Sequence, residues 1–86
     1  MTRYLIETPH KDAECLKALD ELAAQSPKLL AQCNLGCMSG IHTGWAVVEA
    51  GTESEARNMV PPSLRDRARY VKVETLTPEK IRSFHQ

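Results

Sequence analysis

An α+β fold with a four-stranded antiparallel sheet is predicted by two features of the chain. Segments rich in strand-forming residues alternate with segments of helical periodicity in the order β-α-β-β-α-β, followed by a C-terminal helical tail. A hairpin signal joins the second and third strands, which makes them antiparallel neighbours. The 86 residues allow a single domain, 1–86, because two separate cores would each be too small to fold without staples.

The first strand and the first helix occupy the N-terminal third of the sequence. Residues 3–8 are rich in strand formers and end at Pro9. A helix is expected over about residues 11–25, and Ser26-Pro27 ends it. Its predicted buried stripe recurs at steps of three and four residues, at Leu16, Leu19, Leu22 and Ala23.

The middle of the chain carries the hairpin. After an irregular turn at residues 28–30, a strand is expected over about 31–38. The segment Met38-Ser-Gly-Ile-His42 then has turn composition, and the residues that follow it, 43–50, have strand composition and stop at Gly51.

The C-terminal third begins with a capping box. The Thr52 hydroxyl is placed to serve the amide of Glu55, and Glu55 to reach back, so a short helix begins here. Pro61-Pro62 stops that helix, and a turn at residues 63–66 leads to a last strand over 68–76. Thr77-Pro78 then begins the helical tail.

This element order is the split βαβ arrangement of a ferredoxin-like sandwich, in which the first and third strands are central. Two helices cover only one face of such a sheet. In the third strand, however, Trp45 and Val47 point to one side while Ala46, Val48 and Ala50 point to the other. We therefore expect a homodimer in which a second copy covers the open face. In the alternative, Ala46 and Val48 lie on a half-exposed face.

Composition narrows the function classes. Eleven basic and eleven acidic side chains give a formal net charge of zero, which argues against a general nucleic-acid binder. No apolar run approaches the roughly 20 residues of a membrane helix. The N-terminal residues lack the apolar stretch of a signal peptide, and three cysteines cannot form a closed disulfide framework. We expect a soluble, cytoplasmic protein.

Several segments together resemble a known superfamily. They are Arg3-Tyr-Leu-Ile-Glu7, the hairpin with residues 42–50, the helix at Thr52-Glu-Ser-Glu-Ala-Arg57, and residues 60–68. In this combination the chain is similar to the small dimeric α+β-barrel proteins, among them short uncharacterised bacterial and archaeal proteins of the domain-of-unknown-function type. The resemblance implies the fold and the dimer. Because members of that superfamily include metal binders and cofactor-free isomerases and monooxygenases, it leaves the activity open.

The predicted topology gathers chemistry-bearing residues at one end of the sheet. The first strand ends beside the start of the third, which places His10 near His42, and the second strand ends there with Cys37. Imidazole and thiolate ligands suit Zn, Ni or Cu. His10, Cys37 and His42 are therefore the candidate metal ligands. Cys33 joins them only if a bulge at Gly36 brings it close, since residues four apart on a strand are about 13 Å apart.

The same end of the sheet also fits a small-ligand site or a cofactor-free enzyme. In that hypothesis His42 or His10 is a general base, Arg65 or Arg67 holds an anionic group, and Trp45 or Tyr4 forms an aromatic wall. The alternatives are that Trp45 packs in the core, that the two arginines are solvated, and that the chain is an interaction module without any site.

Cys15 is the third cysteine, in the first turn of the first helix. The helix dipole there favours a thiolate, but no second cysteine lies at Cys-x-x-Cys spacing. Ordinary packing is the expectation for Cys15.

Overall fold

The structure, a computed structural model that describes residues 2–85, confirms an α+β fold with a four-stranded antiparallel sheet and five α-helices. The strands lie in the order β2-β3-β1-β4, so the first and third strands are central, as predicted. Their bounds are β1 Thr2–Pro9, β2 Asn34–Leu35, β3 Thr43–Ala50 and β4 Arg69–Val73.

The pairing of β1 with β3 forms the centre of the sheet. Its register runs from Thr2 opposite Ala50 to Pro9 opposite Thr43. Because side chains alternate along a strand, Ile6, Ala46 and Val48 are buried on one face. The alternative of a half-exposed face for Ala46 and Val48 is therefore wrong, since the helices cover that face.

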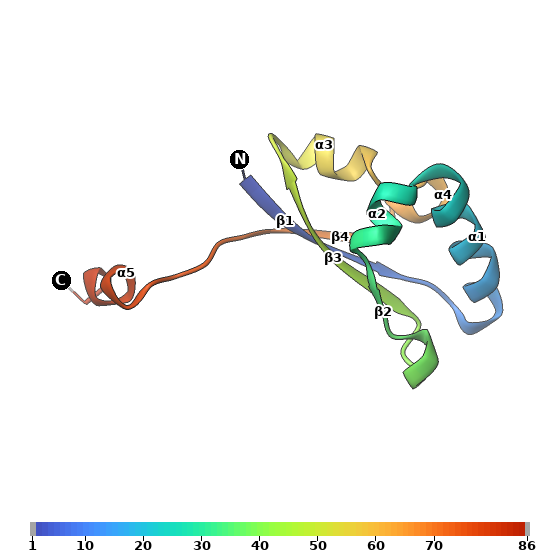
Figure 1. Cartoon of the computed structure of the whole chain (residues 1–86), viewed down its shortest axis with the longest axis horizontal. Helices are drawn as coiled ribbons and strands as arrows, with labels where there is room; N and C mark the ends of the chain where they lie inside the picture. The colour runs from blue at the N-terminus through green and yellow to red at the C-terminus, as the bar shows by residue number, and fades with distance from the viewer. Residues whose placement is uncertain (1, 86) are drawn as a thin grey trace.

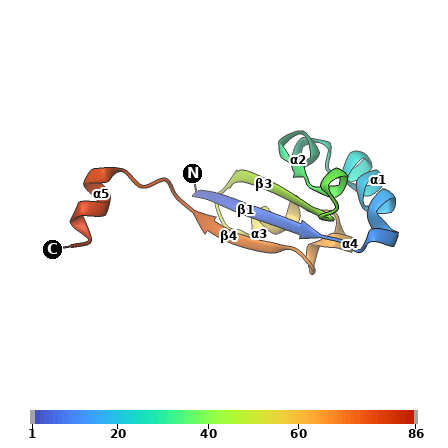
Figure 2. The ribbon, with the colours of Figure 1, turned by 90° about the horizontal axis from the view of Figure 1, so that it is seen from below.

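Four helices lie on one side of the sheet, and α3 and α4 are seen behind the strands in Figure 2. These helices are α1 Cys15–Gln25, α2 Pro27–Gln32, α3 Glu53–Asn58 and α4 Pro62–Arg65. Within residues 2–85, no helix combines the length and the apolar character that crossing a membrane requires. The core between helices and sheet consists of Ile6, Ala18, Leu22, Leu29, Ala46, Val48, Ala50, Ala56, Val60 and Leu64.

Helix α1 buries a different stripe from the predicted one. A 3₁₀ turn at Asp12–Glu14 precedes the helix, which begins at Cys15 rather than near residue 11. Leu22 is only 2% exposed, as predicted, whereas Leu16 is 71% exposed and Ala23 is also exposed, so the prediction is wrong for Leu16 and Ala23. Ala18 and Leu22 form the buried side of the helix and belong to the core. Cys15, three residues before Ala18, shares this inward side.

The predicted strand over residues 31–38 is also wrong in extent. Helix α2 begins at Pro27, a favoured first residue because the amide at this position makes no hydrogen bond within a helix. The helix continues to Gln32 and buries Leu29. Only the two residues of β2 pair with β3, and a 3₁₀ turn at Cys37–Ser39 follows. Gly40 closes the turn at a φ of 84°, in the left-handed region that glycine adopts without strain. The predicted hairpin is thus confirmed with a shorter first strand.

The predicted caps are present. Thr52 Oγ1 accepts a hydrogen bond from the Glu55 amide at 3.2 Å, and Glu55 reaches back to the Gly51 amide at 2.7 Å. Pro61 is extended and ends this segment, but Pro62 starts the short helix α4 where a turn was expected.

The last strand ends at Val73, three residues earlier than predicted, and the chain then leaves the body (Figure 1). Residues 74–84 form what we call the C-terminal arm, which contains α5 Pro78–Ser83. Thr77 caps α5 as predicted, accepting from the Lys80 amide at 3.1 Å. The arm accounts for a radius of gyration of 15.0 Å. A compact chain of this length would have about 12 Å.

The orientation of α1 is testable with two leucines of the same helix. Leu22→Ala should lower the free energy of unfolding by about 2–5 kcal/mol, because it opens a cavity in the core. Leu16→Ala should change it by less than about 0.5 kcal/mol, because that side chain is in solvent. Urea denaturation monitored by circular dichroism measures both. Equal losses for the two variants would contradict the observed orientation.

Candidate metal centre

Two histidines and two cysteines form one cluster at an end of the sheet. One ligand atom from each of His10, Cys15, Cys37 and His42 lies within 4.8 Å of the others, and all four residues are partly buried. Three of these residues were predicted to meet here, and Cys15 is the addition. Each comes from a different segment: the end of β1, the start of α1, the hairpin turn and the approach to β3.

The central strand pair positions the two histidines. Directly beyond the last residue pair of β1 and β3, the His10 amide donates to the His42 carbonyl at 3.0 Å. The two imidazole rings meet edge to face, with centroids 5.6 Å apart and an interplanar angle of 63°. The ladder that organises the core therefore also fixes the spacing of this pair.

The 3₁₀ turn brings Cys37 to the histidines. Its backbone is held by hydrogen bonds from the Ser39 and Ile41 amides to the Gly36 carbonyl, at 2.9 and 3.0 Å. Cys37 Sγ lies 3.4 Å from His10 Nε2. Cys37 lies in this turn and not on an extended strand. The separation of about 13 Å expected between Cys33 and Cys37 on one strand therefore does not apply.

Cys33 lies elsewhere, so Cys15 rather than Cys33 completes the group of four. The Cys33 thiol packs over Gly44, where a Cβ would stand only 2.8 Å from the sulfur, and it contributes to the edge of the core. Burial, and then the neighbouring Cys37, raise the pKa of Cys33.

Cys15 is the site residue that the sequence reasoning missed. It faces inward because Cys15, Ala18 and Leu22 share one side of α1, a spacing of three and four residues that is visible in the sequence. A hydrogen bond with Cys37, and then burial, raise the pKa of the Cys15 thiol. This direction is opposite to the one that a helix dipole would give.

The histidines are prepared as ligands in two ways. Partial burial, and then the nearby His42, lower the pKa of His10, which favours the neutral imidazole that a metal ion requires. His42 Nε2 lies 3.1 Å from Asp12 Oδ1, while His42 Nδ1 is buried and has no hydrogen-bond partner within residues 2–85. An Nε2–H donor to Asp12 leaves the Nδ1 lone pair free, which is the arrangement of a metal-binding histidine held by a carboxylate.

The other predicted ligand-binding residues have structural contacts. Arg65 donates from Nε to the Arg57 carbonyl and from Nη2 to the Val60 carbonyl, both at 2.9 Å. Arg67 pairs with Glu14 at 3.1 Å, and this contact lowers the pKa of the Glu14 carboxyl. Trp45 packs over Gly36 on the open side of the sheet, away from the helices. Ligand binding by these residues stays a prediction.

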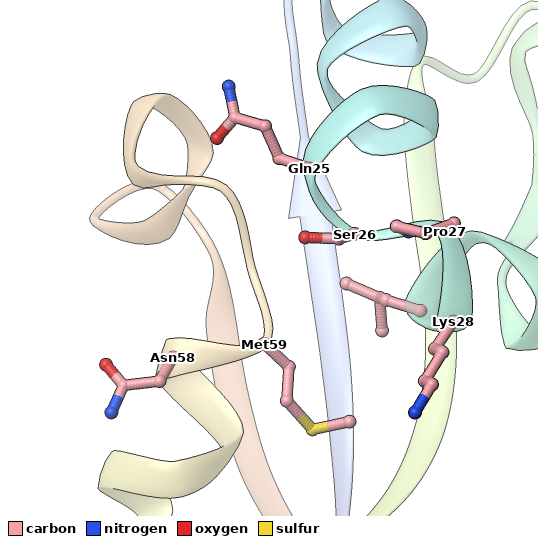
Figure 3. A pocket seen from close by; sticks show the side chains of 7 residues that line it. Gln25, Ser26, Pro27, Lys28, Asn58 and Met59 are labelled. Carbon is pink, nitrogen blue, oxygen red and sulfur yellow. The ribbon is translucent and has the colours of Figure 1, made fainter.

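A shallow hollow of about 330 Å³ lies at the opposite end of α1 from Cys15 (Figure 3). Leu29 and Met59 supply apolar surface there, and Lys28 is its only charged residue. A second hollow, beside Arg67, has a volume of about 30 Å³. Neither is lined by His10 or His42. The complete lining of the first is Gln25, Ser26, Pro27, Lys28, Leu29, Asn58 and Met59.

Comparisons with protein-family models, with curated proteins and with solved structures gave no match for this chain.

Conservative substitutions distinguish the contributions of Arg65 and Arg67 to stability. Arg65→Lys should cost about 1–3 kcal/mol of unfolding free energy, because one ammonium cannot reproduce the contacts to both carbonyls. Arg67→Lys should cost less than about 1 kcal/mol, since its partner Glu14 is at the surface. Urea denaturation measures the difference, and a larger loss for Arg67→Lys would contradict the structural role of Arg65.

Proposed function

We propose that the protein binds one transition-metal ion, of the Zn, Ni or Cu class, through His10, Cys15, Cys37 and His42. The observation that carries the proposal is the convergence of four ligand atoms, from four separate segments, within 4.8 Å. Two thiolates and two imidazoles form a common tetrahedral zinc site. Among the three metals, Zn²⁺ suits this donor set best because it takes four such ligands without redox chemistry.

The distances are compatible with that coordination. With metal–sulfur bonds of about 2.3 Å and metal–nitrogen bonds of about 2.0–2.1 Å, neighbouring ligand atoms of a tetrahedron stand roughly 3.3–3.8 Å apart. Cys37 Sγ and His10 Nε2 are already 3.4 Å apart. The widest spacing, up to 4.8 Å, has to close by about 1 Å, which side-chain rotation supplies.

Asp12 supports the same proposal from outside the ligand set. A metal-ligating histidine commonly donates its other ring N–H to a carboxylate, which fixes the ring and raises its basicity. His42 has this partner in Asp12. A bound cation would also give the unpartnered Nδ1 an interaction that compensates its burial.

A metal held by four protein ligands has a structural role, because no position stays open for substrate. It would tie the end of β1, the start of α1, the hairpin turn and the start of β3 together in a chain of 86 residues, where the core alone is small. Cytoplasmic localisation, also proposed, would keep the three free cysteines reduced.

The cofactor-free enzyme is the second candidate, and the His42–Asp12 pair is the observation that favours it, because a carboxylate orients a histidine base in the same way. We prefer metal binding because two thiols share the cluster.

We also propose the ferredoxin-like assignment and membership of the dimeric α+β-barrel superfamily. The central position of β1 and β3 supports the assignment. The two-residue β2 and the additional helices α2 and α4 are departures from the simple βαββαβ plan.

Metal titration with matched cysteine variants tests the ligand set. Co²⁺ should bind the reduced protein at one equivalent and give the intense visible absorption of tetrahedral, thiolate-ligated cobalt. Cys15→Ser and Cys37→Ser should each weaken binding by at least about 100-fold, because a direct ligand is lost. Cys33→Ala is the matched control and should bind as the unmodified protein does. The proposal would be contradicted if Cys33→Ala lost metal binding while Cys15→Ser kept it.

The role of Asp12 gives a separate expectation. Asp12→Asn should leave the stoichiometry at one ion and weaken the affinity by about 10–100-fold, as for other outer carboxylates. Competition with a chromophoric chelator measures this change. Unchanged affinity would show that Asp12 does not orient His42.

A further inference from the structure

Cys15 and Cys37 bring two free thiols together at the end of the sheet. Both residues are partly buried, and their sulfur atoms lie within 4.8 Å of each other. Cys15 is the first residue of α1, and Cys37 is the first residue of the 3₁₀ turn that follows β2. The two thiols therefore come from segments that are distant in the sequence, and the fold pairs them.

The spacing of the two sulfur atoms is within reach of a disulfide bond. In a disulfide the sulfur atoms stand about 2.0 Å apart, so a pair at 4.8 Å has to close by about 3 Å. Rotation of both side chains between staggered rotamers moves the sulfur atoms over distances of this size. Neither cysteine belongs to the core between helices and sheet, so these rotations leave the core intact.

Cys33 is the competing thiol of the chain. It is not a member of the group whose ligand atoms lie within 4.8 Å of one another. Its sulfur packs over Gly44 and against the edge of the core, and a bond to Cys37 would withdraw it from that contact. Oxidation should therefore join Cys37 to Cys15 and leave Cys33 as a thiol.

We propose that Cys15 and Cys37 form a reversible disulfide that expels the metal ion, a step that rests on the proposed metal site and regulates it. The disulfide and the ion exclude each other, because two sulfur ligands of one tetrahedral ion stand roughly 3.8 Å apart and bonded sulfur atoms about 2.0 Å. After oxidation only His10 and His42 remain of the four ligands. Two imidazoles are too few to complete a structural zinc site.

Hydrogen peroxide is the oxidant in this step. One thiolate attacks a peroxide oxygen, which gives a sulfenic acid and releases hydroxide. The second thiolate then attacks the sulfenic sulfur, forms the sulfur–sulfur bond and displaces a second hydroxide. The two sulfur atoms lose two electrons and the peroxide gains both, while two protons convert the hydroxides to water. Zinc leaves as Zn²⁺ with its charge unchanged, and a dithiol reductant restores both thiols.

Peroxide treatment of the metal-free, full-length protein tests the disulfide by itself. Peptide mapping by mass spectrometry should find one crosslink within the chain, between Cys15 and Cys37. Cys33→Ala is the matched control and should form the same crosslink to the same extent. The proposal would be overturned by a crosslink that involves Cys33, by crosslinks only between chains, or by oxidation of the two thiols to sulfinic acid without a crosslink.

Peroxide treatment of the zinc-loaded protein tests the expulsion. One equivalent of Zn²⁺ should be released, at the rate at which the crosslink forms, and dithiothreitol should restore binding after the peroxide is removed. A chromophoric chelator measures the release. Retention of zinc by the crosslinked protein would overturn the expulsion step. A chain that binds no Zn²⁺ before oxidation would contradict the proposed function and the expulsion with it, whereas the mapping would still decide whether the disulfide forms.

Discussion

The antiparallel pairing of β1 with β3 is the constraint on which the rest of the structure depends. Its register places Ile6, Ala46 and Val48 on one face, where the helices can bury them. The hydrogen bond from the His10 amide to the His42 carbonyl extends the same pairing beyond the strands. A shift by one residue would turn the core residues to solvent and separate the two imidazoles, so the core and the cluster depend on one register.

The sequence predicted elements well where their signals are local. The hydroxyls of Thr52 and Thr77 cap helices, and Gly40 closes the hairpin turn, because each acts within a few residues of itself. The stripe on α1 and the strand over residues 31–38 were not predicted correctly. The rotation of α1 is set by which of its side chains enter the core, here Ala18 and Leu22, and the length of β2 depends on where α2 ends. Both therefore depend on contacts between distant segments.

The residues of the candidate site also divide into those that the sequence predicts and those that depend on packing between distant segments. Topology alone brought His10, Cys37 and His42 together, because strand ends that meet at one edge of a sheet are set by element order. The fourth member could not be chosen that way: Cys15 enters through the rotation of α1, and Cys33 is excluded because its thiol packs over Gly44. Two arginines in the C-terminal half of the chain serve the fold: Arg57 lies over the Tyr70 ring, and Arg65 donates to backbone carbonyls.

X-ray absorption spectroscopy of the zinc-loaded, full-length protein tests the central claim most directly, because it counts the donor atoms around the ion. The account predicts a four-coordinate shell of two sulfur atoms at about 2.3 Å and two imidazole nitrogen atoms at about 2.0–2.1 Å. A shell made only of oxygen and nitrogen, or one with a single sulfur, would contradict the assignment of His10, Cys15, Cys37 and His42 as the metal ligands.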